Sequence, residues 1–310
     1  RDRSVSRGLG DVYKRQKLAS GEKEWILSSG WAGNELLNTD DYRAYVGGTS
    51  GLIYGFINDG FYTVDDFEYF DSASRTWHLK KGVVDSSPLS GIPSPGSAKF
   101  KKLTPVDEDS SNPYLLTSDD RTVIGKTTPK FSGGFGLNAT YKGFDLGLFF
   151  NFMYGFDVFN ANKINLTTFY RNNYNNFGME VASTKRWRNY DDMGNDLRYD
   201  PEALAHFNKN ATIWNPTCMG RPVSMSYAVE DGSFLRLNTA TIGYTLPRVW
   251  TKKVGLNKVR FYVSGYNLFT ITGYSGYDPE VNIATGLTPN IDNDRYPRSR
   301  TYTFGAQLTF

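Results

Sequence analysis

The sequence has very few of the residues that build disulfides and metal sites. Among its 310 residues there are one cysteine, Cys218, and two histidines, His78 and His206. A single cysteine excludes an internal disulfide framework and a cysteine-based zinc site. The two histidines lie far apart in the sequence, and neither has the spacing of a motif such as HExxH. The sequence therefore predicts no cofactor and no metal centre built on cysteine or histidine.

Long apolar runs and the common catalytic motifs are also missing. Only 39% of the residues are hydrophobic, and they are too scattered for a helical membrane protein, whose spans need about 18 or more apolar residues in a row. No GxSxG, P-loop or HExxH motif is found, and no two carboxylates pair on adjacent strand faces as a glycosidase requires. The chain is therefore not expected to be an enzyme. Its 15% aromatic residues and 31 glycines are typical of an extended antiparallel β protein.

The charge of the chain gives no reason to expect a nucleic-acid partner. The net charge is +3, and the first 16 residues, RDRSVSRGLGDVYKRQ, account for all of it. This stretch resembles translated library-adapter sequence, so residues 1–16 are predicted to be a non-native tail, with a genuine basic arm as the alternative. The chain also starts without an initiator methionine or a signal peptide, which predicts that it is a piece of a longer protein.

Several segments alternate apolar and polar residues, which is the pattern of a strand with one apolar face. Residues 135–141 and 144–154 alternate on either side of the tight KGFD turn, so they are predicted to form a hairpin whose apolar faces continue each other. Residues 240–246, residues 259–263 and the closing TYTFGAQLTF alternate in the same way. The stretches EWILSSGW and GLIYGFI are weaker strand candidates.

Short and long connections alternate along the C-terminal half of the chain. The connections at residues 142–145 and 247–257 are short, whereas those at 156–232 and 271–297 are long. Transmembrane β-barrels have short periplasmic turns, long external loops and strands of about 9–11 residues. With the C-terminus in the periplasm, residues 60–130 become a further external loop, in which FEYFDSASRTWHLK predicts a small hairpin. The central part of the 156–232 loop is compatible with helical turns or with an irregular polar loop.

An antiparallel β-sandwich would show the same alternation, with the apolar face on a protein core in place of lipid. Three features favour a barrel. Apolar-face aromatics gather at strand ends, the opposite face is polar, and the loops differ in length between the two sides. The strand-end aromatics are Tyr141, Phe144, Tyr154 and Tyr244. We therefore expect the apolar faces to meet lipid.

The strands and their flanks resemble a known family. GFGLNATYKGFDLGLFFNFMYGFDVFN, VEDGSFLRLNTATIGYTLP, VRFYVSGYNLFTITGYSGYDPEVN and YPRSRTYTFGAQLTF occur in this order, preceded by YGFINDGFY and DDRTVIGKTTPKFSGGF. Over residues 25–310 they resemble the C-terminal third of the SusC/RagA-type TonB-linked outer-membrane transporters of Bacteroidetes. The resemblance implies an all-β fold, with residues 17–310 as the C-terminal portion of a large antiparallel transmembrane β-barrel of about 22 strands. In isolation this portion would be an open curved sheet with long extracellular loops.

The same resemblance implies a function. Members of the family import large nutrients, glycan oligosaccharides or peptides, together with a SusD-like surface lipoprotein that acts as a lid. The TonB complex supplies energy through regions upstream of the matched part. We therefore expect an outer-membrane location in a Gram-negative, Bacteroidetes-type cell, contact with the lipid bilayer and no nucleic-acid partner. The alternative is a soluble β-sandwich that binds or hydrolyses glycans.

Two groups of residues are candidate functional sites. Aromatic residues in the long loop are candidates for contact with substrate or lid, although packing between loops explains any single one of them more simply. They are Phe169, Tyr170, Tyr174, Trp187 and Tyr190. The last strand ends on an aromatic residue, a feature that the barrel-assembly machinery recognises in outer-membrane barrels. The predicted assembly signal consists of Tyr302, Phe304, Leu308 and Phe310.

One acidic stretch departs from the family pattern. Many members carry an Asp- and Gly-rich, calcium-loop-like stretch just before the DDRTVIG motif. Here VDEDSSNPYLLTSDD keeps four aspartates but lacks the glycine that a sharp calcium-binding turn needs. The four weak metal candidates are Asp107, Asp109, Asp119 and Asp120. A solvated acidic loop is the default expectation for this stretch.

Overall fold

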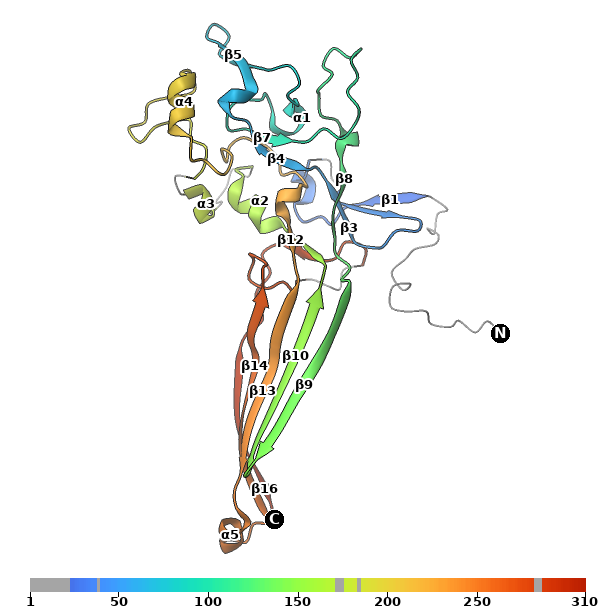
Figure 1. The fold of residues 1–310 in the computed structure, drawn as a ribbon, viewed down its shortest axis with the longest axis vertical. Helices are drawn as coiled ribbons and strands as arrows, with labels where there is room; N and C mark the ends of the chain where they lie inside the picture. Colours follow the sequence, from blue (N-terminus) through green and yellow to red (C-terminus); the bar gives the residue numbers. More distant parts are fainter. Residues whose placement is uncertain (1–22, 38–39, 171–175, 183–184, 282–285) are drawn as a thin grey trace, which may run out of the picture. The chain divides into compact units, whose positions relative to one another are not determined.

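The computed structural model describes residues 23–37, 40–170, 176–182, 185–281 and 286–310 (Figure 1). The chain divides into two compact units. The loop unit comprises Arg1–Thr127, Phe159–Val229 and Asn282–Asn293, and the sheet unit comprises Thr128–Val158, Glu230–Val281 and Asp294–Phe310. Residues 1–16, the predicted adapter-like tail, lie outside the described residues.

The sheet unit is built on a five-stranded antiparallel sheet with the strand order β16-β14-β13-β10-β9 (Figure 1). The strands are β9 (Phe131–Tyr141), β10 (Phe144–Tyr154), β13 (Phe234–Thr245), β14 (Lys258–Thr272) and β16 (Thr301–Thr309). Lys142 and Gly143 join β9 to β10 with left-handed backbones, φ 45° and 88°, as a two-residue hairpin turn of type I′ requires. The predicted hairpin and the other strands predicted in the C-terminal half are confirmed.

The register of the sheet joins the predicted apolar faces into one. Phe144 lies opposite Tyr141 on one neighbouring strand and opposite Tyr244 on the other. The next row of the same face consists of Ala139, Leu146, Ile242, Val263 and Phe304. The row of residues between these two points to the opposite face of the sheet. It consists of polar or small residues, as do most rows of that face. One face is therefore apolar across all five strands, and the other is mainly polar.

A β-bulge at Asn238 changes the alternation within β13. Two consecutive residues of β10 pair with Thr239 and Leu237, so Asn238 has no partner on β10. One extra residue moves every side chain beyond it to the opposite face. Leu237 therefore lies on the apolar face. Arg236, which straight alternation would place among the apolar residues, lies on the polar face.

Arg236 is the centre of a buried ion cluster in the sheet unit. Its side chain is 2% exposed and forms ion pairs with the carboxylates of Asp278 and Glu280. Arg298 contacts Glu280 as well, with 2.8 Å between guanidinium nitrogen and carboxylate oxygen. Because both acidic residues lie in the connection that follows β14, the cluster fixes this connection to the polar face of the sheet by charge.

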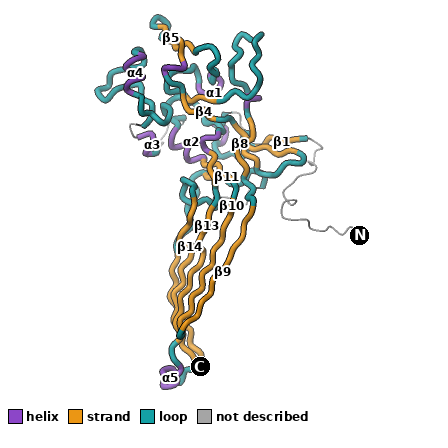
Figure 2. Tube along the Cα trace, in the orientation of Figure 1, coloured by secondary structure: helices purple, strands orange, loops and turns teal. Residues whose placement is uncertain are grey.

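The loop unit contains short strands and helices joined by longer irregular stretches (Figure 2). Its four-stranded sheet has the order β1-β2-β3-β8, and β4 pairs with β7 and β5 with β6. These strands are β1 (Glu24–Leu27), β2 (Tyr42–Tyr45), β3 (Leu52–Gly55), β4 (Asn58–Phe61), β5 (Phe67–Asp71), β6 (Thr76–Leu79), β7 (Ala98–Phe100) and β8 (Thr122–Lys126). A further sheet has the order β12-β11-β15, from β11 (Asp157–Asn160), β12 (Val229–Asp231) and β15 (Ile291–Asp292). The strands predicted in EWILSSGW and GLIYGFI and the hairpin in FEYFDSASRTWHLK are confirmed as β1, β3 and β5–β6.

All helices among the described residues are short. The α-helices are α1 (Ser87–Ser90), α2 (Ala161–Thr167), α3 (Met179–Ala182), α4 (Pro201–Phe207) and α5 (Arg248–Thr251). The 3-10 turns are η1 (Gly33–Glu35), η2 (Val64–Asp66), η3 (Ser118–Asp120), η4 (Ser226–Ala228) and η5 (Lys252–Val254). Of the two alternatives for the long loop, helical turns are found in α2 and α3. Within the described residues, no helix has the length and apolar character needed to cross a membrane.

The core of the loop unit draws on all three of its segments. Phe56 and Phe100 come from the first segment, Phe159 and Trp214 from the second and Ile291 from the third, and each is at most 7% exposed. Burial of apolar side chains on this scale stabilises a fold by about 1.5–3 kcal/mol per large residue. The long connections of the sequence thus fold into a unit with its own core.

A short stretch at residues 289–293 ties the segments of the loop unit together. The hydroxyl of Tyr42 donates to the carbonyl of Pro289 at 2.6 Å, and the side-chain amide of Asn290 donates to the carbonyl of Thr127 at 3.1 Å. The backbone N–H of Phe159 donates to the carbonyl of Asn290 at 2.9 Å. Asn290 itself has a left-handed backbone, with φ 62°, which asparagine tolerates better than most residues.

Asp41 is a carboxyl group buried at the start of β2. It is 0% exposed, and both the backbone N–H and the hydroxyl of Ser29 donate to it. Burial raises the pKa of Asp41 to about 6, against the lowering effect of the bonds from Ser29. The folded protein therefore keeps the proton on Asp41 up to a higher pH than the unfolded chain does.

We expect Arg236→Met to destabilise the sheet unit strongly, because it leaves two carboxylates without their shared buried cation. Breaking a buried ion pair by removing one partner costs roughly 3–5 kcal/mol. The urea midpoint of the protein in detergent micelles, followed by heat-modifiable gel migration, measures this loss. The matched control is Arg260→Met, which removes a more exposed arginine from the same face, with a side chain that is 20% exposed. Equal losses in the two variants would contradict the special role of the cluster.

A second expectation concerns the pH dependence of the loop unit. The folded pKa of Asp41 is raised, so the free energy of unfolding falls as the pH rises from about 4 to about 6, by about 3 kcal/mol. Asp41→Asn removes this fall and makes the protein more resistant to urea at pH 7 than the wild type. Protease resistance of the loop unit in urea, compared at acidic and neutral pH, measures the difference. Asp192→Asn, at a side chain that is 79% exposed, should leave the wild-type pH dependence unchanged.

Candidate functional site

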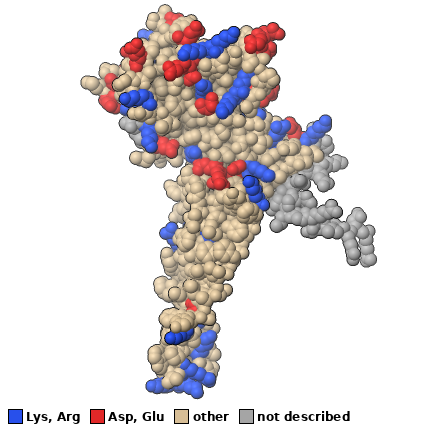
Figure 3. Space-filling model, viewed as in Figure 1, with Lys and Arg blue, Asp and Glu red and all other residues tan. Residues whose placement is uncertain are grey.

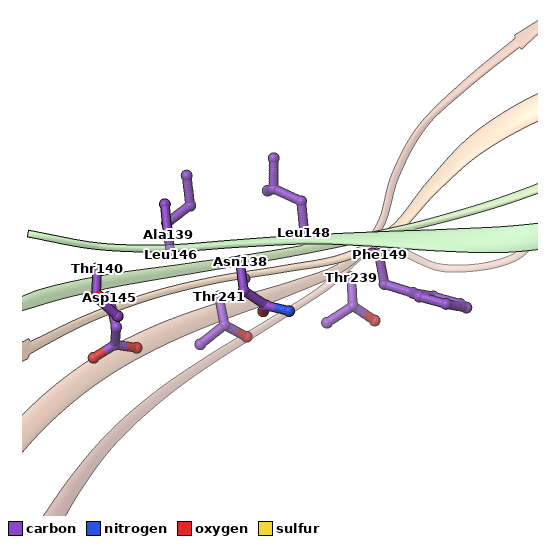
Figure 4. Close-up of a pocket in the computed structure, with 11 residues that line it drawn as sticks. Asn138, Ala139, Thr140, Asp145, Leu146, Leu148, Phe149, Thr239 and Thr241 are labelled. Carbon is purple, nitrogen blue, oxygen red and sulfur yellow. The ribbon is translucent and has the colours of Figure 1, made fainter.

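An open hollow of about 460 Å³ lies on the polar face of the sheet. Figure 4 shows Asn138, Thr239, Thr241 and Phe149 pointing to this side, whereas Leu148 points to the opposite side. The hydroxyls of Thr241 and Ser264 lie 2.8 Å apart and form a hydrogen bond across β13 and β14. The hollow is thus lined by hydroxyl, amide and carboxylate groups, by the ring of Phe149 and by the apolar residues Ala139, Leu146 and Leu148.

An ion pair and two glycines shape the same face nearer its turn end. The guanidinium of Arg260 donates to both carboxylate oxygens of Asp145, so the two charges cancel on the polar face of the sheet. The side chains of Arg260 and Tyr262 lie flat over glycines of neighbouring strands. A Cβ at Gly305 would lie 2.3 Å from the Tyr262 ring, and a Cβ at Gly243 would lie 2.5 Å from the Arg260 guanidinium. Glycine is therefore required at both positions for these side chains to cover the sheet.

The predicted loop aromatics are distributed between surface and core. Phe169 and Tyr190 are 40% and 48% exposed and remain accessible. Tyr170 packs partly against the core of the loop unit, and its hydroxyl donates to Asn165. Trp187 is 3% exposed and packs on Phe61, so the structure gives it a packing role. Tyr174 lies outside the described residues.

An aromatic surface that the sequence did not indicate lies on the β5–β6 hairpin and the stretch at residues 190–199. The ring of Phe70 lies 5.1 Å from that of Trp77 and 5.8 Å from that of Tyr199, measured between centroids. Two guanidinium groups stack on Tyr199, from Arg75 at 5.0 Å and Arg198 at 5.4 Å. We call these residues, together with Tyr190, the hairpin patch. Tyr190 and Tyr199 are 48% and 41% exposed, so the patch offers aromatic rings held in place by arginines.

The four metal candidates do not come together. Asp120 is 0% exposed and accepts hydrogen bonds from the backbone N–H groups of Leu103, Thr104 and Thr117. Burial alone would raise the pKa of Asp120, but these bonds, with one from the Thr104 hydroxyl, outweigh it and lower the pKa to about 2. The carboxylate therefore holds its own loop together. Within the described residues, no group of three or more His, Cys, Asp or Glu side chains is placed to hold a metal ion.

The predicted assembly signal lies on one face of the last strand. Tyr302, Phe304 and Leu308 belong to the apolar face and are 60%, 77% and 51% exposed, and Phe310 follows at 83%. β16 pairs with β14 along Lys258–Tyr266 and is an edge strand among the described strands. The side chains are therefore presented together at an edge of the sheet, as recognition by another protein would need.

The chain is similar in sequence to several TonB-dependent receptors. No family model matches it. It is 32% identical over 228 residues to the TonB-dependent receptor P3 of Formosa agariphila, a match that covers 72% of this chain and 20% of the relative. It is also 32% identical over 149 residues to the TonB-dependent receptor SusC of Bacteroides thetaiotaomicron, covering 44% of this chain and 14% of the relative. The chain thus spans about a fifth or less of the length of these two relatives.

Solved structures share its fold. The RagAB peptide importer in its open-open state aligns with a TM-score of 0.58 at 22% identity, over 96% of this chain and 26% of that chain. The closed-closed state of the same importer aligns with a TM-score of 0.57 at 21% identity, over 94% of this chain and 25% of that chain. At this identity the likeness shows the fold, that of part of a large transmembrane β-barrel. The resemblance seen in the sequence motifs is confirmed, and the chain belongs to the SusC/RagA-type TonB-dependent receptors.

Proposed function

We propose that the chain is part of an outer-membrane transporter that imports large polar nutrients, glycan oligosaccharides or peptides, driven by the TonB complex. The two-sided sheet is the observation that carries this proposal. Its apolar face leaves Tyr141, Phe304 and Phe310 at 70%, 77% and 83% exposed, which is stable against lipid and unfavourable in water. Its polar face offers hydroxyls, amides and a compensated ion pair to a wet interior. A polar solute can pass along such a wall.

The alternative of a soluble β-sandwich has less support. A sandwich packs the apolar faces of two sheets against each other at a spacing of about 10 Å. The apolar face of this sheet is instead exposed along β9 and β16, and at Phe144, Leu146 and Tyr154 of β10, in the described structure. The relatives named above are receptors and importers, which also argues against a glycosidase.

The surface of the loop unit supports a role in capturing the nutrient or docking a SusD-like lid. Aromatic rings stack on sugar faces, and guanidinium groups pair with carboxylates of peptides. The hairpin patch offers the exposed rings of Tyr190 and Tyr199 and the guanidinium of Arg75, whereas the guanidinium of Arg198 is already paired with Asp196. Phe169 adds an accessible ring in the same unit. One solved structure with this fold is named a peptide importer, and the resemblance to the SusC/RagA-type family implies glycan oligosaccharides as the other class, so an uptake experiment needs both nutrient classes.

We expect deletion of the gene for the complete protein to abolish uptake of one labelled nutrient class, glycan oligosaccharides or oligopeptides. The reason is that no other barrel paired with the same lid would carry that cargo across the outer membrane. Uptake by cells, with fractionation and heat-modifiable gel migration of the protein, provides the measurement. A protein found in the soluble periplasmic fraction, with uptake of both classes unchanged, would overturn the proposal.

Within the complete transporter, Tyr199→Ala should weaken binding of the transported nutrient or of the lid lipoprotein. One aromatic contact of about 0.5–1.5 kcal/mol corresponds to a roughly two- to tenfold loss of affinity. Calorimetric titration of the purified protein measures it. Tyr277→Ala is the matched control, since Tyr277 is 84% exposed but lies in the sheet unit outside the patch. Unchanged affinity for nutrient and lid in Tyr199→Ala would remove the patch from the proposal.

Phe310→Ala should reduce the amount of assembled barrel in the outer membrane several-fold, if the barrel-assembly machinery reads the last strand. Membrane fractions and heat-modifiable migration measure the assembled protein. Phe131→Ala is the matched control, because Phe131 is another exposed aromatic residue of the apolar face, 55% exposed, on the strand at the opposite edge. Equal amounts of assembled protein in the two variants would mean that Phe310 contributes apolar area and no signal.

A further inference from the structure

The connection between β13 and β14 exposes apolar side chains at one end of the sheet. It runs through α5 and η5 and presents Val249, Trp250 and Val254, which are 72%, 58% and 70% exposed. A tryptophan and two valines clustered within a few residues are an unfavourable surface in water. Some other medium or molecule is therefore expected to cover them.

The segment is a folded turn, so the exposure is a property of its structure. The N–H of Trp250 donates to the carbonyl of Pro247 at 2.9 Å, and the N–H of Leu256 donates to that of Thr251 at 3.1 Å. Thr251 is buried, and Gly255 closes the turn with a left-handed backbone, φ 73°. The apolar side chains are held outward by a turn that has its own backbone hydrogen bonds.

The same turn is strongly basic. Residues 246–258 contain Arg248, Lys252, Lys253 and Lys258 and no acidic residue. In the described part of the chain, Arg248, Lys252 and Lys253 form no ion pair, and Asp145, the nearby acid of the sheet, is already paired with Arg260. Figure 3 shows the basic side chains gathered around α5 at this end of the sheet unit. The turn therefore carries several positive charges that no carboxylate neutralises.

The position of the turn identifies the covering medium. It follows directly on the last aromatic row of the apolar face, which contains Tyr141, Phe144 and Tyr244. Aromatic residues of this kind mark the boundary between hydrocarbon and headgroups, and tryptophan is enriched at the same depth. The exposed side chains of α5 and η5 thus continue an interface that the barrel already forms with lipid.

We infer that the 246–257 turn binds anionic phospholipid headgroups of the leaflet at this end of the barrel. Val249, Trp250 and Val254 enter the boundary between headgroups and acyl chains. Arg248, Lys252 and Lys253 pair with lipid phosphates. Charge complementarity favours anionic lipid over zwitterionic lipid, and continuity with the lipid-facing surface favours lipid over a soluble protein. The inference rests on the sheet crossing a bilayer.

The test places a fluorescent nitrobenzoxadiazole label at Val254→Cys in the complete receptor, with Cys218→Ser as background. The protein is reconstituted into vesicles of phosphatidylcholine alone or with about 30 mol% phosphatidylglycerol. The label should be severalfold less accessible to aqueous iodide, and more strongly quenched by headgroup-proximal doxyl lipid, in the anionic vesicles. Lys252→Gln with Lys253→Gln should remove most of that difference, since each basic residue near an anionic surface raises local partition about fivefold.

The matched control is Lys80→Gln with Lys81→Gln, which makes the same charge change at two adjacent exposed lysines of the loop unit. This pair should leave the difference between the vesicles intact. Iodide access that is equal in both vesicle types would overturn the inference. Protection that appears only when periplasmic extract is added would overturn it too, in favour of a protein partner.

A second label separates this inference from the proposed function. Phe304→Cys reports from the apolar face, one row inside the last aromatic row. If the label at residue 304 is shielded by lipid while the label at residue 254 stays in water, the turn does not bind headgroups. The proposal that the sheet crosses a bilayer then stands. If the label at residue 304 is itself in water, the sheet does not cross the bilayer and both proposals fail.

Discussion

The sheet unit depends on one constraint: inside a bilayer every backbone N–H and C=O group must be bonded within the protein, because hydrocarbon offers no partner. The inner strands β14, β13 and β10 meet this constraint by antiparallel pairing on both sides, and β9 and β16 pair on one side in the described structure. Pairing of this kind fixes the side-chain period at two residues, so one face can be apolar along its whole width while the other stays polar. The two faces are thus a consequence of the backbone's need for partners, and the transport hypothesis follows from the faces.

The same constraint explains which parts of the fold could be predicted. Residues 144–154 and 301–309 pair without a register shift to β9 and β14, and there simple alternation predicts the correct strand and face. At Asn238 the ladder gains one residue, and nothing in the composition marks that position. Simple alternation would have placed Arg236 towards lipid. The bulge turns it to the polar face, where two carboxylates neutralise it, because an unpaired charge in hydrocarbon is very unfavourable.

The loop unit and its surfaces were much less predictable, because their contacts join residues that are far apart in the chain. Trp187 has the character of a contact residue in the sequence, yet it packs against Phe61 in the core. Trp77 and Tyr199 carry no joint signal in the sequence, yet both lie against Phe70. Asp120 likewise belongs to an acidic stretch, but its carboxylate accepts hydrogen bonds from backbone N–H groups of its own loop. Local pattern predicts elements, whereas the assignment of side chains to core or surface needs the long-range packing.

Charge placement in the sheet unit follows from the same physics as the strands. Arg236 and Arg260 lie on the polar face, and each is paired with carboxylates that cancel its charge. Arg248, Lys252 and Lys253, which form no ion pair with any described residue, lie in the turn beyond the last aromatic row, where water and lipid phosphates can reach them. Trp250 is stable at that depth because its ring is apolar and its N–H group can still find a partner. A bilayer therefore accounts for the position of both the tryptophan and the cations, whereas water alone would account for the cations and leave the exposed tryptophan unexplained.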